Sequence, residues 1–233
     1  MGTLYLVRHG QASFGAEDYD HLSPLGQQQS VRLGEYFRQK GVVFDSVLTG
    51  TLRRHQQTYA AICEGMAPLG DSAANAVASV GAALLWPGLN EFDSLALIAA
   101  VHPQPLEKPD TPERYKHHFR LLREGLTQWM NGVVSPRGMP SYCAFQLGVT
   151  SALEHIRKNC EGNVLLVSSG GPIATAIGHV LGTTPETTIE LNLRIRNSAI
   201  TEFAFTRKRH TLLTFNTLPH LERDEWAHWV THS

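Results

Sequence analysis

Short apolar runs of strand length alternate with segments of helical periodicity in the first part of the chain. The run Leu4–Val7 is apolar throughout, as in a strand that is buried on both faces of a parallel sheet. Gly10 then allows a sharp turn out of that strand. The pattern continues with a helix, a strand and a second helix, at residues 23–41, 42–49 and 52–63. This order of elements predicts parallel α/β topology.

The alternation stops between about Gly65 and Ser141. This block contains Ala-rich and Pro-punctuated stretches and a predicted helix at 113–130, and it resembles an insertion packed over a core. The core pattern then resumes with a helix, a buried strand, a helix and two final strands, at residues 143–158, 163–168, 173–181, 198–206 and 211–216. One domain with a sizeable insertion suits a chain of 233 residues.

The composition is that of an ordinary globular protein, with 42% hydrophobic and 18% charged residues. A net charge of −1 gives no reason to expect attraction to nucleic acid or to a membrane surface. The start of the chain lacks the basic and apolar regions of a signal peptide. The three cysteines are widely spaced and odd in number, which indicates reduced, mostly buried thiols. We therefore expect a cytoplasmic protein.

Three of the predicted core strands end in residues that could carry chemistry: Arg8-His9-Gly10, Thr49–Arg54 and Ser168–Gly171. The carboxyl ends of parallel strands share one edge of the sheet, where ligands of open α/β sheets bind. An arginine offers a planar charged fork for phosphate or carboxylate. A histidine, with an ordinary pKa of ~6.5, offers a neutral ring nitrogen as a nucleophile or base. Of the adjacent Arg53 and Arg54, helical geometry lets only one point at this edge.

Five segments, in the right order, resemble the histidine phosphatase superfamily, the phosphoglycerate-mutase-like proteins. Arg8-His9-Gly10 matches the family signature after an N-terminal strand. Aligning the family's second-arginine helix on Leu52 and Thr58 selects Arg54 as the functional arginine. The remaining segments that resemble the family are 22–29, 89–93, and the C-terminal pair 197–200 and 219–221, which resemble its final strands.

The resemblance covers nearly the whole chain and implies a three-layer α/β/α fold. Its central sheet would be mostly parallel, with an inserted, largely helical cap region. Residues 1–233 would form a single histidine-phosphatase-like domain, with an insertion at about 65–141 over the active site.

The resemblance also implies roles for four residues. His9 would attack a phosphoryl group and carry it as a phosphohistidine, which splits one displacement into two. Arg8 and Arg54 would clamp the phosphoryl oxygens. Glu91 would protonate the leaving oxygen and then activate water; because Asp93 is nearby, Glu91 could instead be an ordinary loop carboxylate. No metal or other cofactor is called for, and the histidines and cysteines lack the spacing of a metal site.

The third strand end departs from the family pattern. The family has Ser-His-Gly there, with the histidine contacting phosphate, whereas this chain has Ser168-Ser169-Gly170. Ser169 can still donate one neutral hydrogen bond, with help from the Gly170 amide at the helix N-terminus. Losing a bond to a charged partner would slow the reaction by about one to two orders of magnitude. Another histidine could take the vacant place, but His55 lies about 100° around the helix from Arg54. Ser169→His should raise turnover unless the place is already compensated.

The sequence therefore predicts a metal-independent phosphomonoesterase that acts through a phosphohistidine on His9. Its partner would be a phosphorylated small molecule or a phosphoprotein. The alternative is a catalytically weakened member that binds a phospho-ligand or a protein, because Ser169 replaces the second histidine. Gln11 opens a polar loop beside the first strand and is a further candidate substrate-binding residue. Phosphoglycerate mutase activity is not expected, since Ala12 and Gly15 stand where the family commonly has threonine and asparagine.

Overall fold

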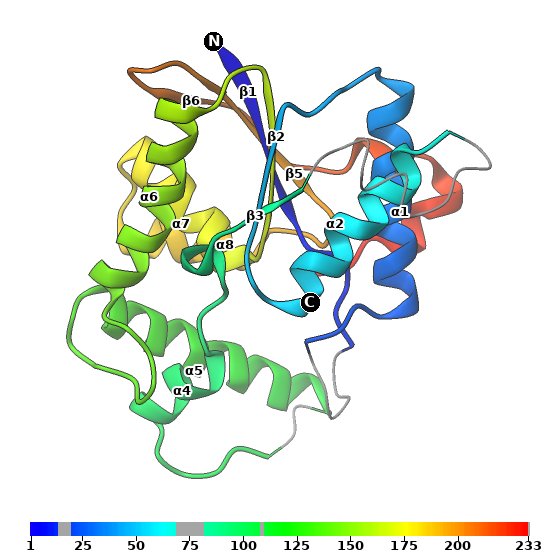
Figure 1. Ribbon diagram of the computed structural model, residues 1–233. Helices are drawn as coiled ribbons and strands as arrows, with labels where there is room; N and C mark the ends of the chain where they lie inside the picture. The colour runs from blue at the N-terminus through cyan, green and yellow to red at the C-terminus, as the bar shows by residue number, and fades with distance from the viewer. Residues whose placement is uncertain (14–19, 69–81, 108–109, 233) are drawn as a thin grey trace.

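The computed structural model describes residues 1–13, 20–68, 82–107 and 110–232. A six-stranded sheet in the order β3-β2-β4-β1-β5-β6 forms its centre, with helices on both faces (Figure 1). Strands β1 to β4 run parallel, and β5 and β6 add an antiparallel edge. The strands are β1 (Gly2–Arg8), β2 (Ser46–Thr49), β3 (Leu84–Leu85), β4 (Asn163–Ser168), β5 (Ile200–Phe205) and β6 (His210–Thr217). The predicted three-layer α/β fold with a mostly parallel sheet is confirmed.

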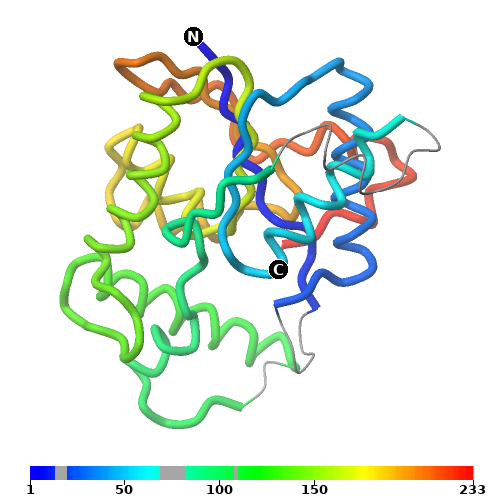
Figure 2. The backbone as a smooth tube through the Cα atoms, in the orientation of Figure 1, coloured from blue at the N-terminus to red at the C-terminus, as the bar shows by residue number. Residues whose placement is uncertain are grey.

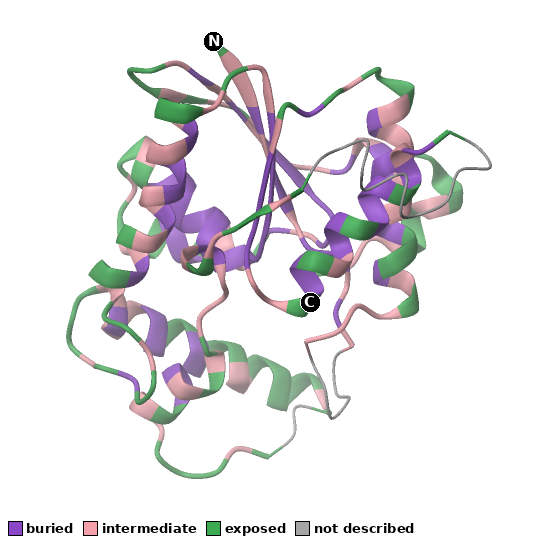
Figure 3. Cartoon of the chain, viewed as in Figure 1, coloured by how far each residue is buried: buried purple, intermediate pink, exposed green. Residues whose placement is uncertain are grey.

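Alternate residues of the central strands face opposite helical layers, as the two-residue period of a strand requires. Leu4 and Leu6 of β1 belong to the core under one layer, and Val7 belongs to the core under the other. In Figure 3 the buried positions run along these strands and along the start of the helix after β4. The first layer contains α6 (Tyr142–Asn159) and α7 (Gly170–Leu181); the second contains α1 (Pro24–Gln39) and α2 (Arg53–Met66).

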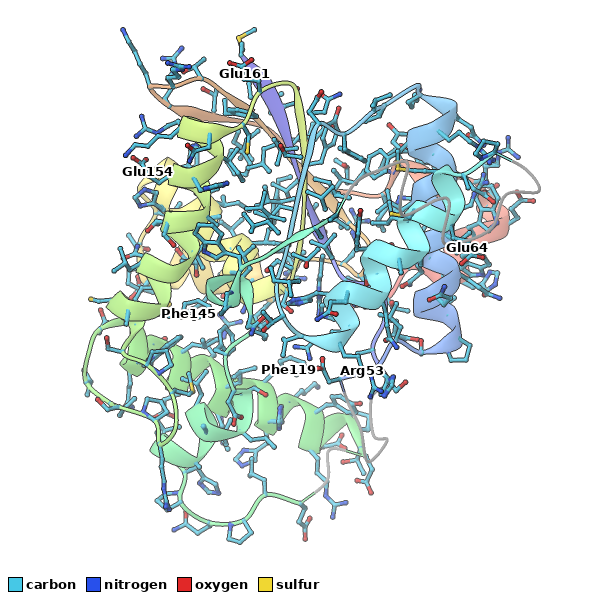
Figure 4. All side chains as sticks on the ribbon, viewed as in Figure 1. Arg53, Glu64, Phe119, Phe145, Glu154 and Glu161 are labelled. Carbon is cyan, nitrogen blue, oxygen red and sulfur yellow. The ribbon has the colours of Figure 1, made fainter. Side chains whose placement is uncertain are left out.

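Two helices of the predicted insertion, α4 (Ser94–Val101) and α5 (Pro112–Met130), lie beyond the carboxyl ends of the parallel strands (Figure 1). Trp129 of α5 is fully buried, and its ring centroid lies 5.3 Å from that of Phe145, which Figure 4 labels on α6. Apolar residues of α4 and α5 thus belong to the same core as α6 and α7. This shared core joins the two helices of the predicted insertion to the helices that cover the sheet.

Several local predictions are wrong. The second strand starts only at Ser46, because Gly41 (φ +64°) ends α1 and the residues after it form the exit turn. Pro219–Leu221 is a 3₁₀ helix rather than a strand. Cys63 is buried, but Cys143 is exposed and Cys160 half-buried, so the thiols are not mostly buried. The pattern also gave no sign of α4 and α8 (Pro185–Asn192), or of the short helices η1 (Pro87–Leu89) and η3 (Asp224–Trp229).

The C-terminal segment returns to the carboxyl end of β1 (Figure 2). The Asn197 amide donates to the Thr231 carbonyl oxygen at 3.0 Å, and the Arg8 guanidinium donates to the His232 carbonyl oxygen at 3.0 Å. The chain end therefore lies beside the sheet edge that carries the candidate site. No helix in the described ranges is long and apolar enough to span a bilayer.

Candidate active site

His9 lies immediately after β1, where the backbone is held from both sides. Its amide donates to the Ser168 carbonyl oxygen at 2.9 Å, and its carbonyl oxygen accepts from the Ser198 amide at 3.2 Å. The side chain is 2% exposed. These bonds continue the pairing of β1 with its neighbours past the strand end, so the imidazole is held on a rigid support.

The turn at Gly10 sets the protonation of the His9 ring. Nδ1 lies 2.7 Å from the Gly10 carbonyl oxygen. A carbonyl oxygen only accepts, so Nδ1 carries the ring proton and Nε2 keeps its lone pair. A Cβ at Gly10 would lie 2.3 Å from the Gly26 carbonyl oxygen, so only glycine lets this turn approach α1 so closely. Burial, followed by the charges of Arg8 and Arg54, lowers the pKa of His9 well below 6.5. The ring is therefore neutral and nucleophilic at pH 7.

Arg8 ends β1 and is held by backbone carbonyl groups of the C-terminal region. Its Nη1 donates to the carbonyl oxygens of Ile195 and His232. Its charge lowers the pKa of both His9 and Glu91. The guanidinium thus acts electrostatically on both predicted catalytic residues while the backbone fixes its position.

Arg54 in the first turn of α2 supplies the second charge. Its side chain is nearly buried, whereas Arg53 is exposed at the end of α2 that is turned toward α5 (Figure 4). Arg54 Nη1 donates to Asp20 Oδ1 at 2.8 Å. The Thr58 hydroxyl donates to the Arg54 carbonyl oxygen at 2.8 Å and accepts from the Gly10 amide at 3.1 Å. Thr58 thereby links the turn that carries His9 to the helix that carries Arg54.

Glu91 reaches the same edge from the segment after η1. Its Oε2 accepts from the Gly171 amide at 3.1 Å, and its Oε1 accepts from the Phe92 amide at 3.2 Å. Burial raises the pKa of Glu91, and the Gly171 amide and the two arginines oppose this rise. Asp93 is exposed and caps α4, with Oδ1 accepting from two backbone amides. Of these two carboxyl groups, Glu91 is the one that bonds the start of α7 and interacts with the charges of Arg8 and Arg54.

Ser169 occupies the place where the family has its second histidine, and it is fully buried. Its hydroxyl oxygen lies 2.7 Å from Nε2 of His55, a residue from the first turn of α2. The ring centroids of His55 and His9 are 5.7 Å apart. Burial, and then the charge of Arg54, lowers the pKa of His55 to about 3. A second imidazole therefore does lie at the site.

The other predicted residues have defined positions. Gly170 begins α7, and the amide of the next residue, Gly171, is bonded to Glu91. The side-chain oxygen of Gln11 accepts from the Ser23 hydroxyl at 2.8 Å, so it holds the N-terminus of α1. The substrate-binding role of Gln11 stays a prediction. Ala12 forms a bridge with Leu22, whereas Gly15 lies outside the described residues. Within the described ranges, no cluster of three or more His, Cys, Asp or Glu could hold a metal.

Comparison with known families gives a match over most of the chain. The sequence model of the histidine phosphatase superfamily (branch 1) matches residues 4–73 and 104–218. The chain belongs to this superfamily. A broad-specificity phosphatase of Saccharomyces cerevisiae is 32% identical over 65 residues. That alignment spans 25% of this chain and 28% of the yeast protein.

Solved structures of similar fold include three that align over nearly their whole length. Phosphoserine phosphatase of Entamoeba histolytica, in complex with 3-phosphoglyceric acid, is 22% identical with a TM-score of 0.62, covering 95% of this chain and 100% of its own. YhfR of Bacillus stearothermophilus is 17% identical with a TM-score of 0.66, at the same coverage. Mycobacterial glucosyl-3-phosphoglycerate phosphatase is 18% identical with a TM-score of 0.62, covering 93% of this chain and 99% of its own. These likenesses support the histidine phosphatase fold.

Sequence reasoning underrated His55 and missed Asp20. Consecutive helical residues point about 100° apart, but this angle does not keep His55 out of the site. The side chains of Arg54 and His55, both in the first turn of α2, are buried. Arg54 meets Asp20, and His55 meets Ser169. For His55, the sequence offered one signal: it directly follows Arg54, the arginine selected by the family resemblance. Asp20 gave none, because its contact with the start of α2 is made only in the tertiary structure.

Proposed function

We propose that this histidine phosphatase family member is a metal-independent phosphomonoesterase that forms a phosphohistidine on His9. The main support is the His9 ring: neutral and buried, with its proton on Nδ1 toward Gly10 and its lone pair on Nε2. Arg8 and Arg54 act on it electrostatically, and a carboxyl group with a raised pKa belongs to the same site. This combination suits attack on an anionic phosphoryl group.

The reaction proceeds in two displacements at phosphorus. In the first, His9 Nε2 forms a bond to phosphorus, the bond to the leaving oxygen breaks, and Glu91 in its acid form gives that oxygen its proton. In the second, the Glu91 carboxylate takes a proton from water, the water oxygen bonds to phosphorus, and the N–P bond breaks. Arg8 and Arg54 stabilise the charge on the phosphoryl oxygens. The products are an alcohol and inorganic phosphate, and His9 and Glu91 return to their starting states.

The proposed substrates are small phosphorylated metabolites. The relatives named above act on phosphoserine and on a sugar-linked phosphoglycerate, or have broad specificity. A screen of phosphorylated metabolites in the presence of EDTA, with phosphate release as the readout, would rank the substrates.

The decisive experiment traps the intermediate. Protein incubated with a ³²P-labelled substrate and quenched in alkali should carry label that is stable to base and labile to acid, at His9. The His9→Ala variant should carry no such label and should lose turnover. His179→Ala is a matched control, because His179 is exposed on α7, and it should label like the wild type. Equal turnover in the wild type and His9→Ala would refute the proposal, and tight phosphate binding without turnover would favour the binding-protein alternative.

A further inference from the structure

His55 and Ser169 form a buried pair from separate elements, α2 and the start of α7. Both side chains are 0% exposed, and His55 Nε2 lies 2.7 Å from Ser169 Oγ. Room for the ring comes from Gly50, where a Cβ would lie 2.2 Å from His55 Nδ1. A buried, hydrogen-bonded imidazole next to the nucleophile is not needed to hold α2 in place, since that helix already has Thr58 and an apolar face.

The Ser169 hydroxyl is not used to cap its own helix. A serine at this position usually accepts from the second or third amide of the helix. In the described structure the Ser169 side chain makes no capping bond, and the amide of Gly171 donates to Glu91 instead. The hydroxyl is therefore available to the active site, and His55 is its partner.

The direction of the bond follows from the other ring nitrogen. His55 Nδ1 is buried and has no hydrogen-bond partner among the described residues. A buried N–H without an acceptor is rare and costly, so Nδ1 is best left without a proton. The ring proton then lies on Nε2 and is donated to Ser169 Oγ. Ser169 is left with its own O–H, which can be donated to a ligand. The low pKa of His55, about 3, keeps the ring in this neutral form at pH 7.

We propose that His55 is a positioning residue that acts through Ser169, and that the pair takes the place of the family's second phosphate-binding imidazole. In the complex the hydrogen bonds run from His55 Nε2 to Ser169 Oγ and from the Ser169 hydroxyl to a phosphoryl oxygen. A donor that itself accepts a bond is polarised and binds an anion more strongly. This inference rests on the proposed phosphatase function for its ligand, a phosphoryl group bound beside His9.

The pair also changes what Ser169→His should do. With Oγ only 2.7 Å from the His55 ring, an imidazole at position 169 would overlap the one at position 55. Overpacking of a buried site forces shifts in its neighbours. Ser169→His alone should therefore lower turnover, which is the outcome expected where the vacant place is already compensated. Combined with His55→Ala, which vacates the space, it should recover part of the lost rate.

The test is a double-mutant cycle on two readouts, kcat with p-nitrophenyl phosphate and the dissociation constant for inorganic phosphate. His55→Phe keeps a ring but removes the donor, and His55→Gln keeps a side-chain N–H. We expect Ser169→Ala and His55→Phe each to lower kcat by about 10- to 100-fold, the effect of one bond to a charged group. His55→Gln should retain much of the wild-type rate. In the Ser169→Ala background, His55→Phe should have little further effect.

Independent, multiplicative losses in the double variant would overturn the inference, as would a wild-type kcat in His55→Phe. Thermal unfolding of each variant identifies any that fail to fold; should His55→Phe do so, His55→Ala, alone and with Ser169→Ala, completes the cycle. The trapped label at His9 separates the two proposals. Label in the wild type with no coupling in the cycle refutes only the role of His55. Coupled phosphate affinities without label refute only the phosphohistidine mechanism.

Discussion

Glu91→Gln separates the general-acid role of this residue from its structural role. The two carboxylate oxygens accept one bond each, from the Gly171 and Phe92 amides. A glutamine supplies one oxygen and one NH₂ group, so it keeps one of these bonds and loses the other. One hydrogen bond contributes about 0.5–1.5 kcal/mol to stability, which corresponds to a few degrees in Tm for a chain of this size. The variant should therefore fold.

The loss of activity should be much larger and should depend on the leaving group. General acid catalysis contributes about 10²–10⁴-fold when the leaving oxygen needs a proton. We expect Glu91→Gln to lower kcat/KM, which reports only the first displacement, at least ~100-fold on an alkyl phosphate such as phosphoserine. On p-nitrophenyl phosphate, whose leaving phenolate is stable without a proton, the loss of kcat/KM should be much smaller. Steady-state kinetics on both substrates give the comparison.

The pH profile gives a second readout. Burial raises the pKa of Glu91, and catalysis needs its protonated form. In the wild type, kcat/KM for phosphoserine should fall as the pH rises through that raised pKa, and in Glu91→Gln this alkaline limb should be absent. Asp93→Asn is the matched control, because it keeps the oxygen that caps α4, and it should behave like the wild type. Equal losses on both substrates, or an alkaline limb that survives in Glu91→Gln, would refute the general-acid assignment.

Two further predictions follow from the same geometry. A Cβ at Gly171 would lie 2.1 Å from Glu91 Oε1, so Gly171→Ala should displace the carboxyl group and lower kcat on phosphoserine. Gly178→Ala, where the added Cβ would meet only the side chains of Thr183 and Thr188, should not lower it; a wild-type kcat in Gly171→Ala would contradict this. His55 and His220 have pKa values of about 3, so below pH 6.5 the unfolded chain binds protons there that the folded chain does not. The free energy of unfolding, measured with urea, should then fall by about 2 kcal/mol per site between pH 7 and pH 5, and His220→Gln should reduce that fall; a constant value would contradict the burial argument.

The sequence by itself determined the longer parallel strands, β1 and β4, and the residues at their ends, together with the approximate place of β2. An apolar run such as Leu4–Val7 is typical of a strand buried on both faces, and consecutive strand–helix units bring their carboxyl ends to one edge. This order predicted that Arg8, His9 and one of the adjacent Arg53 and Arg54 lie at one sheet edge, and the family resemblance selected Arg54. The short strand β3 and the uniformly apolar helix α4 carry no such periodic signal, which is why pattern reasoning did not find them.

The tertiary structure decided which side chains share a buried site across different elements. Asp20 meets Arg54, and His55 meets Ser169, through contacts between residues 34 and 114 positions apart in the chain. No local pattern encodes such a pair, because its geometry depends on how closely α2 approaches the start of α7. The same packing places the His55 imidazole beside Ser169, where the sequence indicated only that the family's second histidine is missing. It also selects Glu91 over Asp93, since only Glu91 faces the amide of Gly171.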